Sequence, residues 1–203
     1  MSKYIWLLDP GHGGMLNGAY QTRGKRSPVF PDGSVLYEGV FNRDIASRIK
    51  ALCDAESIEC EDIVNSEHDV PLATRAARAN SRQAADPRCR YISIHANAWG
   101  DATSFNSAHG ASSFHYMTSK VGKKMATALL KHIVQETGLK SRGVQANMNW
   151  ANFYVLRKTN MPAILSENGF MTNLEDATNL MKDDFRQKVA LAHFNFIKEM
   201  ESL

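Results

Sequence analysis

The alternation of short apolar segments with longer amphipathic segments is the feature that most constrains the fold of this chain. Six short segments have the apolar or alternating pattern of β-strands: Tyr4–Leu8, Ile58–Val64, Tyr91–His95, Ala111–Met117, Phe153–Leu156 and Pro162–Leu165. Four longer segments have helical spacing, at about 39–54, 72–84, 119–137 and 183–202. Strands that alternate with helices favour an α/β sheet that is covered by helices on both faces.

Several residues mark the ends of the expected helices. Asp69 is a candidate N-cap for the second helix, and Gly138 is positioned to end the third. Asp183 and Asp184 lie in the first turn of the last helix, where the helix dipole favours negative charge.

Length and composition exclude several classes of protein. A chain of 203 residues suits one domain with a substantial core, so residues 1–203 are expected to form a single domain. The net charge of +3 is too small to indicate nucleic-acid binding. No apolar run approaches the length of a membrane span, and the run before Asp9 is too short for a signal peptide. We expect a soluble protein made in the cytoplasm, with Cys53, Cys60 and Cys89 as reduced thiols.

Four residues that can bind metal or move protons are expected at one edge of the sheet. His12 follows the first strand, His95 ends "YISIH" and Glu167 ends "PAILSE", while Glu38 lies where a long loop meets the first helix. Each alone has a plain structural explanation, such as a turn residue, a core histidine or a helix N-terminal charge. A structural explanation fits Glu167 least well. Its position after apolar residues implies burial, and a buried carboxylate without a partner is energetically costly. Ligands of open α/β sheets bind beyond the carboxyl ends of strands, so the four residues are interpreted together.

The chemistry of this set suits amide hydrolysis. Two histidines and one glutamate, with a water molecule, complete a tetrahedral zinc site of the catalytic type. A second carboxylate beside the metal can take a proton from water and pass it to a leaving amine. The sequence lacks a phosphate-binding loop and a G-x-S-x-G nucleophile motif, which disfavours the competing chemistries.

Five motifs in order resemble one enzyme family. The segments "LDPGHGG", "EGVFN", "LATRAARAN", "ISIHANA" and "ILSENGFMTN" are similar in order and spacing to the zinc-dependent N-acetylmuramoyl-L-alanine amidases of the Amidase_3 group. The resemblance runs from Ile5 to the last helix. It implies a central mixed, largely parallel sheet of about six strands flanked by helices on both faces, and a catalytic amidase domain over residues 1–203.

The resemblance also implies a set of site residues. By motif, His12, Glu38 and His95 would hold Zn²⁺, and Glu167 would be the catalytic glutamate. The reaction would be hydrolysis of the amide between N-acetylmuramic acid and L-alanine of the peptidoglycan stem peptide. Glu167 would act first as the base and then as the acid that protonates the departing nitrogen. Peptidoglycan would be the partner of a monomeric enzyme, with no nucleic acid and no membrane insertion.

Further residues are weaker candidates. Arg75 and Asn80 match an arginine and an asparagine of the family and are interpreted as structural or as supporting the metal ligands. Arg75 is also a candidate for substrate binding, as is Asn97, which lies two residues beyond His95. Trp99 and Phe105 are expected to line the groove.

The loops suggest how the site is reached. The basic residues Arg23, Lys25 and Arg26 lie in a long loop that leads to Glu38, where they would meet an anionic peptide or form a solvated loop. Gram-negative division amidases resemble this family but carry an inhibitory helix after the "HAN" motif. The short segment after His95 leaves little room for one, so an open site is expected.

The sequence is compatible with several biological settings and functions. A compact catalytic domain without an export signal is typical of a phage or prophage endolysin, which is released from the cytoplasm at lysis and then acts on the cell wall. The alternatives are a bacterial autolysin of the same activity, a zinc peptidase that cleaves within the stem peptide, and a non-catalytic peptidoglycan-binding module.

Overall fold

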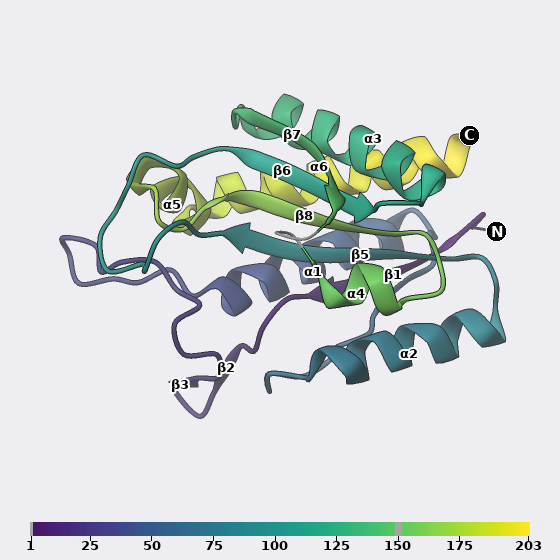
Figure 1. Ribbon diagram of the computed structural model, residues 1–203, viewed down its shortest axis with the longest axis horizontal. Helices are drawn as coiled ribbons and strands as arrows, with labels where there is room; N and C mark the ends of the chain where they lie inside the picture. The colour runs from purple at the N-terminus through teal and green to yellow at the C-terminus, as the bar shows by residue number, and fades with distance from the viewer. Residues whose placement is uncertain (1, 149–151) are drawn as a thin grey trace.

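A six-stranded mixed sheet forms the centre of the computed structural model, which describes residues 2–148 and 152–203 (Figure 1). In spatial order its strands are β4 (Cys60–Asp62), β1 (Ile5–Pro10), β5 (Cys89–Asn97), β8 (Ala163–Phe170), β6 (Ala111–Tyr116) and β7 (Ser141–Asn147). The first four strands are parallel to one another, β6 runs antiparallel to β8, and β7 is parallel to β6. The expectation of an α/β fold with a mixed, largely parallel sheet is confirmed.

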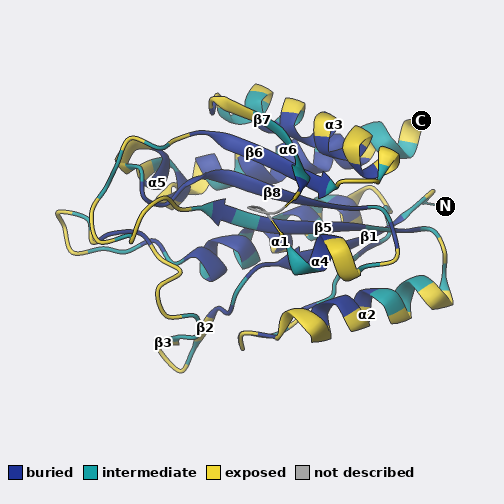
Figure 2. Cartoon of the chain, viewed as in Figure 1, coloured by how far each residue is buried: buried dark blue, intermediate teal, exposed yellow. Residues whose placement is uncertain are grey.

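Helices cover both faces of this sheet (Figure 1). One face carries α1 (Glu38–Ala55), α3 (Lys120–Thr137) and α6 (Asp183–Ser202), and the other carries α2 (Leu72–Ala85) and the short α4 (Tyr154–Lys158). Helix α5 (Leu174–Met181) packs against α6 and β8. Successive side chains of β1 point to opposite faces of the sheet. Trp6 and Leu8 belong to the core beneath α1, α3 and α6. Ile5 and Leu7 belong to the second core, beneath α2 and α4. Figure 2 shows the buried strands between helices whose outer surfaces are exposed.

The ends of the helices follow the sequence signals in part. Gly138 takes the left-handed conformation that ends α3, and Ser119 caps its start by accepting a hydrogen bond from the Gly122 N–H. The prediction that Asp69 caps the start of α2 is wrong. The N-cap position is Pro71, which makes no side-chain hydrogen bond to the helix. The Asp69 carboxylate instead accepts a hydrogen bond from the Thr22 hydroxyl at 2.7 Å.

Some elements differ from the sequence expectation. The segment 153–156 is expected to be a strand, but Phe153 is the N-cap of α4 and residues 154–156 belong to that helix, from which Val155 and Leu156 reach the core beneath α2 and α4. A short apolar run is compatible with the periodicity of a strand and with that of a helix, so the sequence pattern alone does not distinguish the two structures. Strand β7, helix α5 and the hairpin of β2 (Met15–Leu16) and β3 (Ala19–Tyr20) were not expected.

The sequence predicts that the three cysteines are free thiols, and the structure agrees. Cys53, Cys60 and Cys89 are free and buried. Within residues 2–148 and 152–203, no helix is long and apolar enough to cross a membrane.

Candidate metal centre and active site

The structure brings three of the expected residues together as a group that can hold a metal ion. One ligand atom each from His12, Glu38 and His95 lies within 4.8 Å of the others. The two carboxylate oxygens of Glu38 reach the two imidazoles, with Oε2 3.2 Å from Nε2 of His12 and Oε1 2.9 Å from Nδ1 of His95. The two rings meet edge to face, with their centroids 5.0 Å apart.

The loop after β1 holds His12 in an uncommon backbone conformation. His12 has a φ of 63°, in the left-handed region that few residues other than glycine adopt. Its carbonyl accepts hydrogen bonds from Arg43 at 2.9 Å and from Arg75 at 2.8 Å. Next to it, the Gly13 N–H donates to the Thr22 hydroxyl at 2.8 Å. These bonds fix the turn, so the imidazole is directed toward Glu38 and His95.

Glu38 is the first residue of α1 and is almost fully buried. Its N–H donates to the Lys25 carbonyl at 3.0 Å, which ties the long loop to the start of the helix. The next residue must be glycine, because a Cβ at Gly39 would lie 1.8 Å from the carbonyl oxygen of Gly13. This close approach sets Glu38 beside His12.

The electrostatics of the group favour the ionised form of the Glu38 carboxylate. Burial raises the pKa of Glu38, but hydrogen bonds and charges of His12 and His95 outweigh it, so the pKa lies below its usual range. Burial lowers the pKa of His95, whereas the Glu38 carboxylate raises it, and the net effect is a raised pKa. The pocket therefore stabilises positive charge next to Glu38.

Glu167 lies beside this group on the same face of the sheet. It pairs with His95 in the register of β5 and β8, and its side chain lines the same cavity. The residue is 7% exposed, and its Oε2 has no hydrogen-bond partner among the described residues. Burial raises its pKa to about 8, with a further increase from the Glu38 charge that His95 and Lys25 oppose. An unpartnered carboxyl group of this kind is suited to proton transfer.

The donor set fits a tetrahedral zinc ion. Ligand atoms about 2.0–2.1 Å from zinc in tetrahedral geometry are about 3.3 Å from one another. The distances of 3.2 Å from His12 to Oε2 and 2.9 Å from His95 to Oε1 join different oxygens of Glu38, and the three ligand atoms lie within 4.8 Å of one another, so the side chains would draw closer around a bound zinc ion. The two imidazoles are also partly exposed, so a fourth position remains accessible from the cavity.

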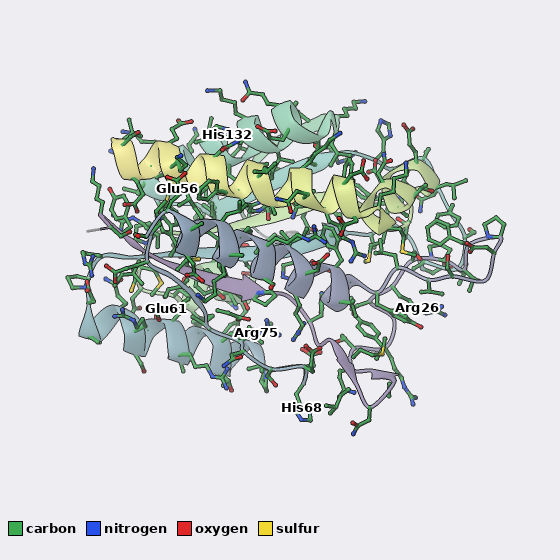
Figure 3. The ribbon with its side chains drawn as sticks, turned by 180° about the vertical axis from the view of Figure 1, so that it is seen from behind. Arg26, Glu56, Glu61, His68, Arg75 and His132 are labelled. Carbon is green, nitrogen blue, oxygen red and sulfur yellow. The ribbon has the colours of Figure 1, made fainter. Side chains whose placement is uncertain are left out.

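Arg75 supports the loop that carries His12. Its guanidinium lies between α2 and β1 and contacts Asp9, with 2.6 Å from Nη1 to Oδ1 (Figure 3). Both side chains are buried, and Tyr91 and Ser93 also donate hydrogen bonds to Asp9. Burial raises the pKa of Asp9, but the Arg75 charge and these bonds outweigh it and hold the pKa below its ordinary value. Although Arg75 borders the cavity, its donors are used within the protein.

A cavity of about 930 Å³ lies over the cluster. Asn97 and Trp99 line it as expected, and Trp99 is 68% exposed. Phe105 does not line it, because its ring packs against Phe30 at 5.1 Å. Residues 98–110, all of them described, contain no helix between β5 and β6. The expectation that no inhibitory helix follows β5 is thus confirmed in the structure.

Other residues singled out in the sequence lie elsewhere. Asn80 bonds to the backbone of Lys158 and Asn160, away from the cavity. His193 is fully buried in α6, as a packed histidine, and contacts Ser166 at 2.9 Å.

Sequence reasoning missed several residues of the site. Asp9, Arg43 and Asn42 all position the loop around His12, and Arg142 lines the cavity. Asp9 carried a usable signal, since a carboxylate directly after the apolar run "IWLL" has the same pattern as Glu167.

Known proteins resemble this chain over nearly its full length. A family model described as N-acetylmuramoyl-L-alanine amidase matches residues 7–199. The endolysin of Bacillus phage SPP1 is 32% identical over 209 residues, which cover 100% of this chain and 68% of that protein. The N-acetylmuramoyl-L-alanine amidase LytC of Bacillus subtilis is 30% identical over 92% of this chain, which spans 33% of LytC. The crystal structure of N-acetylmuramoyl-L-alanine amidase from Clostridium difficile 630 superposes with a TM-score of 0.80 at 25% identity, covering 98% of this chain and 97% of that one.

Proposed function

Since the chain belongs to the N-acetylmuramoyl-L-alanine amidase family, we propose that it cleaves peptidoglycan with a zinc ion held by His12, Glu38 and His95. The bond is the amide between N-acetylmuramic acid and L-alanine of the stem peptide. Glu167 is the proton-transferring group. Residues 1–203 act as one catalytic domain, and the active form is a monomer.

One observation carries the proposal. Three ligands of suitable type converge within 4.8 Å, and a fourth group, Glu167, lies next to them unpartnered and buried on the wall of the same cavity. A binding module for peptidoglycan would need neither the ligands nor the unpartnered carboxyl group. The arrangement matches a catalytic metal site, in which three protein ligands leave one position open.

The mechanism assigns a separate role to each group. When bound, zinc supplies a Lewis acid that polarises the scissile carbonyl and lowers the pKa of water. Glu167 accepts a proton from the attacking water and then donates it to the departing alanine nitrogen. The Arg75–Asp9 pair holds the loop of His12 and is a positioning element, while Asn97 on the cavity wall contacts the substrate.

The pKa of Glu167 suits this role. In the protein alone, burial raises the pKa to about 8. A cation held by the neighbouring ligands lowers it from there, because an opposite charge favours the carboxylate. The two effects oppose each other, and a carboxyl group whose pKa lies above its ordinary range can serve as base and then as acid near neutral pH.

Product analysis tests the bond that is cleaved. Purified sacculi are digested with the protein, and the soluble products are identified by mass spectrometry. The proposal predicts free stem peptides that begin with L-alanine, together with glycan strands that lack peptide. Fragments cleaved inside the stem would instead establish a zinc peptidase. Binding to sacculi without any release of peptide would establish a binding module.

The setting that we propose is lysis of a bacterium by a phage or prophage. The phage endolysin named above matches along this whole chain, which supports that role. A bacterial autolysin is the alternative, supported by the similarity to LytC. Deletion of the gene from its host separates the two roles, since only an endolysin is needed for lysis after phage induction.

A further inference from the structure

A bulge in the edge strand β7 changes the direction of Arg142. Ala111 of β6 pairs with Ser141, but Ser113 pairs with Val144, so β7 contains one extra residue opposite Ser112. Arg142 and Gly143 are the two residues of β7 that lie opposite Ser112. Gly143 has a φ of 89°, which glycine adopts readily. Bulges of this type occur beside active sites, where they redirect a side chain.

The neighbouring residues show the effect of the bulge. Val144 packs against the core that contains α3, and Gln145 lines the cavity on the other face. If the side chains of β7 alternated regularly back from Val144 and Gln145, the side chain of Arg142 would lie on the face of the sheet that α3 covers. Instead, Arg142 lines the cavity, and its guanidinium lies over the Phe170 ring at 4.9 Å from the centroid.

The guanidinium of Arg142 is held in place but is not neutralised. It stacks on Phe170, which is buried, and donates a hydrogen bond of 3.3 Å to the His109 carbonyl. Over the part of the chain that the structure describes, no carboxylate pairs with it. The other arginine of the cavity, Arg75, is paired with Asp9. Arg142 is therefore a pre-oriented cation that faces the cavity with donors to spare.

The distance from Arg142 to the reacting groups is set by the sheet. Ser112 pairs with Glu167 on β8, and the bulge lies opposite Ser112 on β7. Arg142 thus lies two strands from Glu167, or about 10 Å between backbones. For a stem peptide that runs from Glu167 across β6 toward β7, an advance of about 3.3–3.6 Å per residue places the second residue beyond the cleaved bond roughly 7 Å away. An arginine side chain spans the remaining gap.

We propose that Arg142 binds the α-carboxylate of the second residue of the stem peptide. That residue is a glutamate joined through its side-chain carboxyl, which leaves its α-carboxylate free in some cell walls and amidated in others. A guanidinium recognises a carboxylate through two parallel hydrogen bonds, which a neutral amide cannot reproduce. The inference rests on the proposed amidase function and adds a preference for cell walls that are not amidated at this position.

A pair of soluble muropeptides tests this preference. They differ only in a free or an amidated α-carboxyl at the second residue, and kcat/KM is measured for both. The wild-type protein is expected to favour the acid by about tenfold or more, mainly through KM. The Arg142→Gln variant should lose this preference by becoming slower on the acid alone, and Arg142→Lys should retain part of it. Circular dichroism spectra and thermal unfolding midpoints that match those of the wild-type protein show that the variants are folded.

Two further variants serve as controls. Lys140→Ala removes an exposed cation beside β7 that does not line the cavity, and it should leave the preference unchanged. Lys25→Ala removes the lysine of the cavity and should also keep the preference. A wild-type protein that treats both muropeptides alike overturns the inference. So does an Arg142→Gln variant that still prefers the acid, or a preference lost with Lys25 instead.

Binding of the product peptide separates this inference from the amidase function. Calorimetry measures the affinity of L-alanyl-γ-D-glutamyl-L-lysine, whose glutamate has only its α-carboxylate free, for the wild-type protein and for Arg142→Gln. If neither muropeptide is cleaved, the proposed function fails, but at least tenfold weaker binding by the variant would still support the carboxylate site. Equal binding by the two proteins overturns the role of Arg142.

Discussion

Glu167 and His95 occupy paired positions on neighbouring parallel strands, with both side chains on the wall of one cavity. This register places Glu167, the proposed proton-transferring group, directly beside His95, a proposed metal ligand. It also keeps the two roles on separate residues, so they can be removed one at a time.

Replacement of Glu167 by glutamine should abolish proton transfer and leave metal binding intact. Glutamine has nearly the same shape but cannot accept or release the proton, so a loss of at least about 10²-fold in kcat is expected. Turnover of muropeptides and metal content per chain are the two readouts. An active Glu167→Gln variant would remove Glu167 from the mechanism, and loss of the metal would make it a ligand.

The absence of a side chain at Gly11 makes room for His95. A Cβ at Gly11 would lie 2.1 Å from Cε1 of the His95 ring, so Gly11→Ala must displace that ring. Misplaced ligands typically cost about 10–100-fold in metal affinity, and we expect a loss of this size. Competition with a chelator measures it. Gly24→Ala is the control: its positive φ of 86° strains an alanine, but no atom would lie within 4 Å of the new Cβ, so its zinc affinity should not change.

Asp9 and Arg75 form a buried ion pair that should support both stability and the His12 loop. Asp9→Asn leaves the guanidinium of Arg75 without its charged partner, and breaking a buried pair in this way costs about 3–5 kcal/mol. Urea denaturation measures the change in the free energy of unfolding. The surface variant Asp86→Asn, which weakens an exposed contact with Arg88, should change it little. Arg75 would be a substrate ligand instead if Arg75→Lys raised KM at unchanged stability.

His193 should make the protein less stable in acid. Burial lowers its pKa from 6.5 to about 4, so between these values the unfolded chain binds a proton that the folded chain does not. The contribution of the neutral imidazole is therefore present above pH 6.5 and is lost as the pH falls to about 4. It amounts to roughly 3 kcal/mol.

The variant His193→Gln isolates this contribution. Glutamine does not titrate, so the free energy of unfolding of the variant should vary less between pH 6.5 and 4 than that of the wild-type protein. The difference between the two proteins, measured by urea denaturation over this range, removes the effect of the other histidines. Parallel pH profiles would show that His193 is not the group responsible.

The main features of the fold could be predicted because its core elements follow simple periods. Strand β1 is a continuous apolar run, and α1 places Phe41, Ile45 and Ile49 on one buried face. The closeness of His12 and His95 could be predicted because His12 follows β1 directly and His95 lies in β5, and these strands are parallel neighbours in the sheet. In the structure, β5 and β8 extend beyond His95 and Glu167, since polar residues within a buried strand look like its end.

The remaining elements depend on contacts that a single sequence does not reveal. Strand β7 is an edge strand with few apolar residues, and its bulge at Gly143 interrupts the alternation that would have marked it. Because of that bulge, nothing in the sequence placed Arg142 in the cavity. The partners of His12 lie far apart in sequence, so neither Arg43 nor Arg75 could be assigned its bond to that carbonyl in advance.

The dependence of activity on bound zinc tests the central claim most directly. The protein is stripped with a chelator, dialysed and titrated with zinc while the release of L-alanine-terminated peptides is followed. We predict no activity in the stripped protein and full recovery at one zinc ion per chain, with no recovery in a His12→Ala variant that remains folded. Full activity in protein shown to be free of metal would contradict the account, as would recovery in the His12→Ala variant at the same stoichiometry.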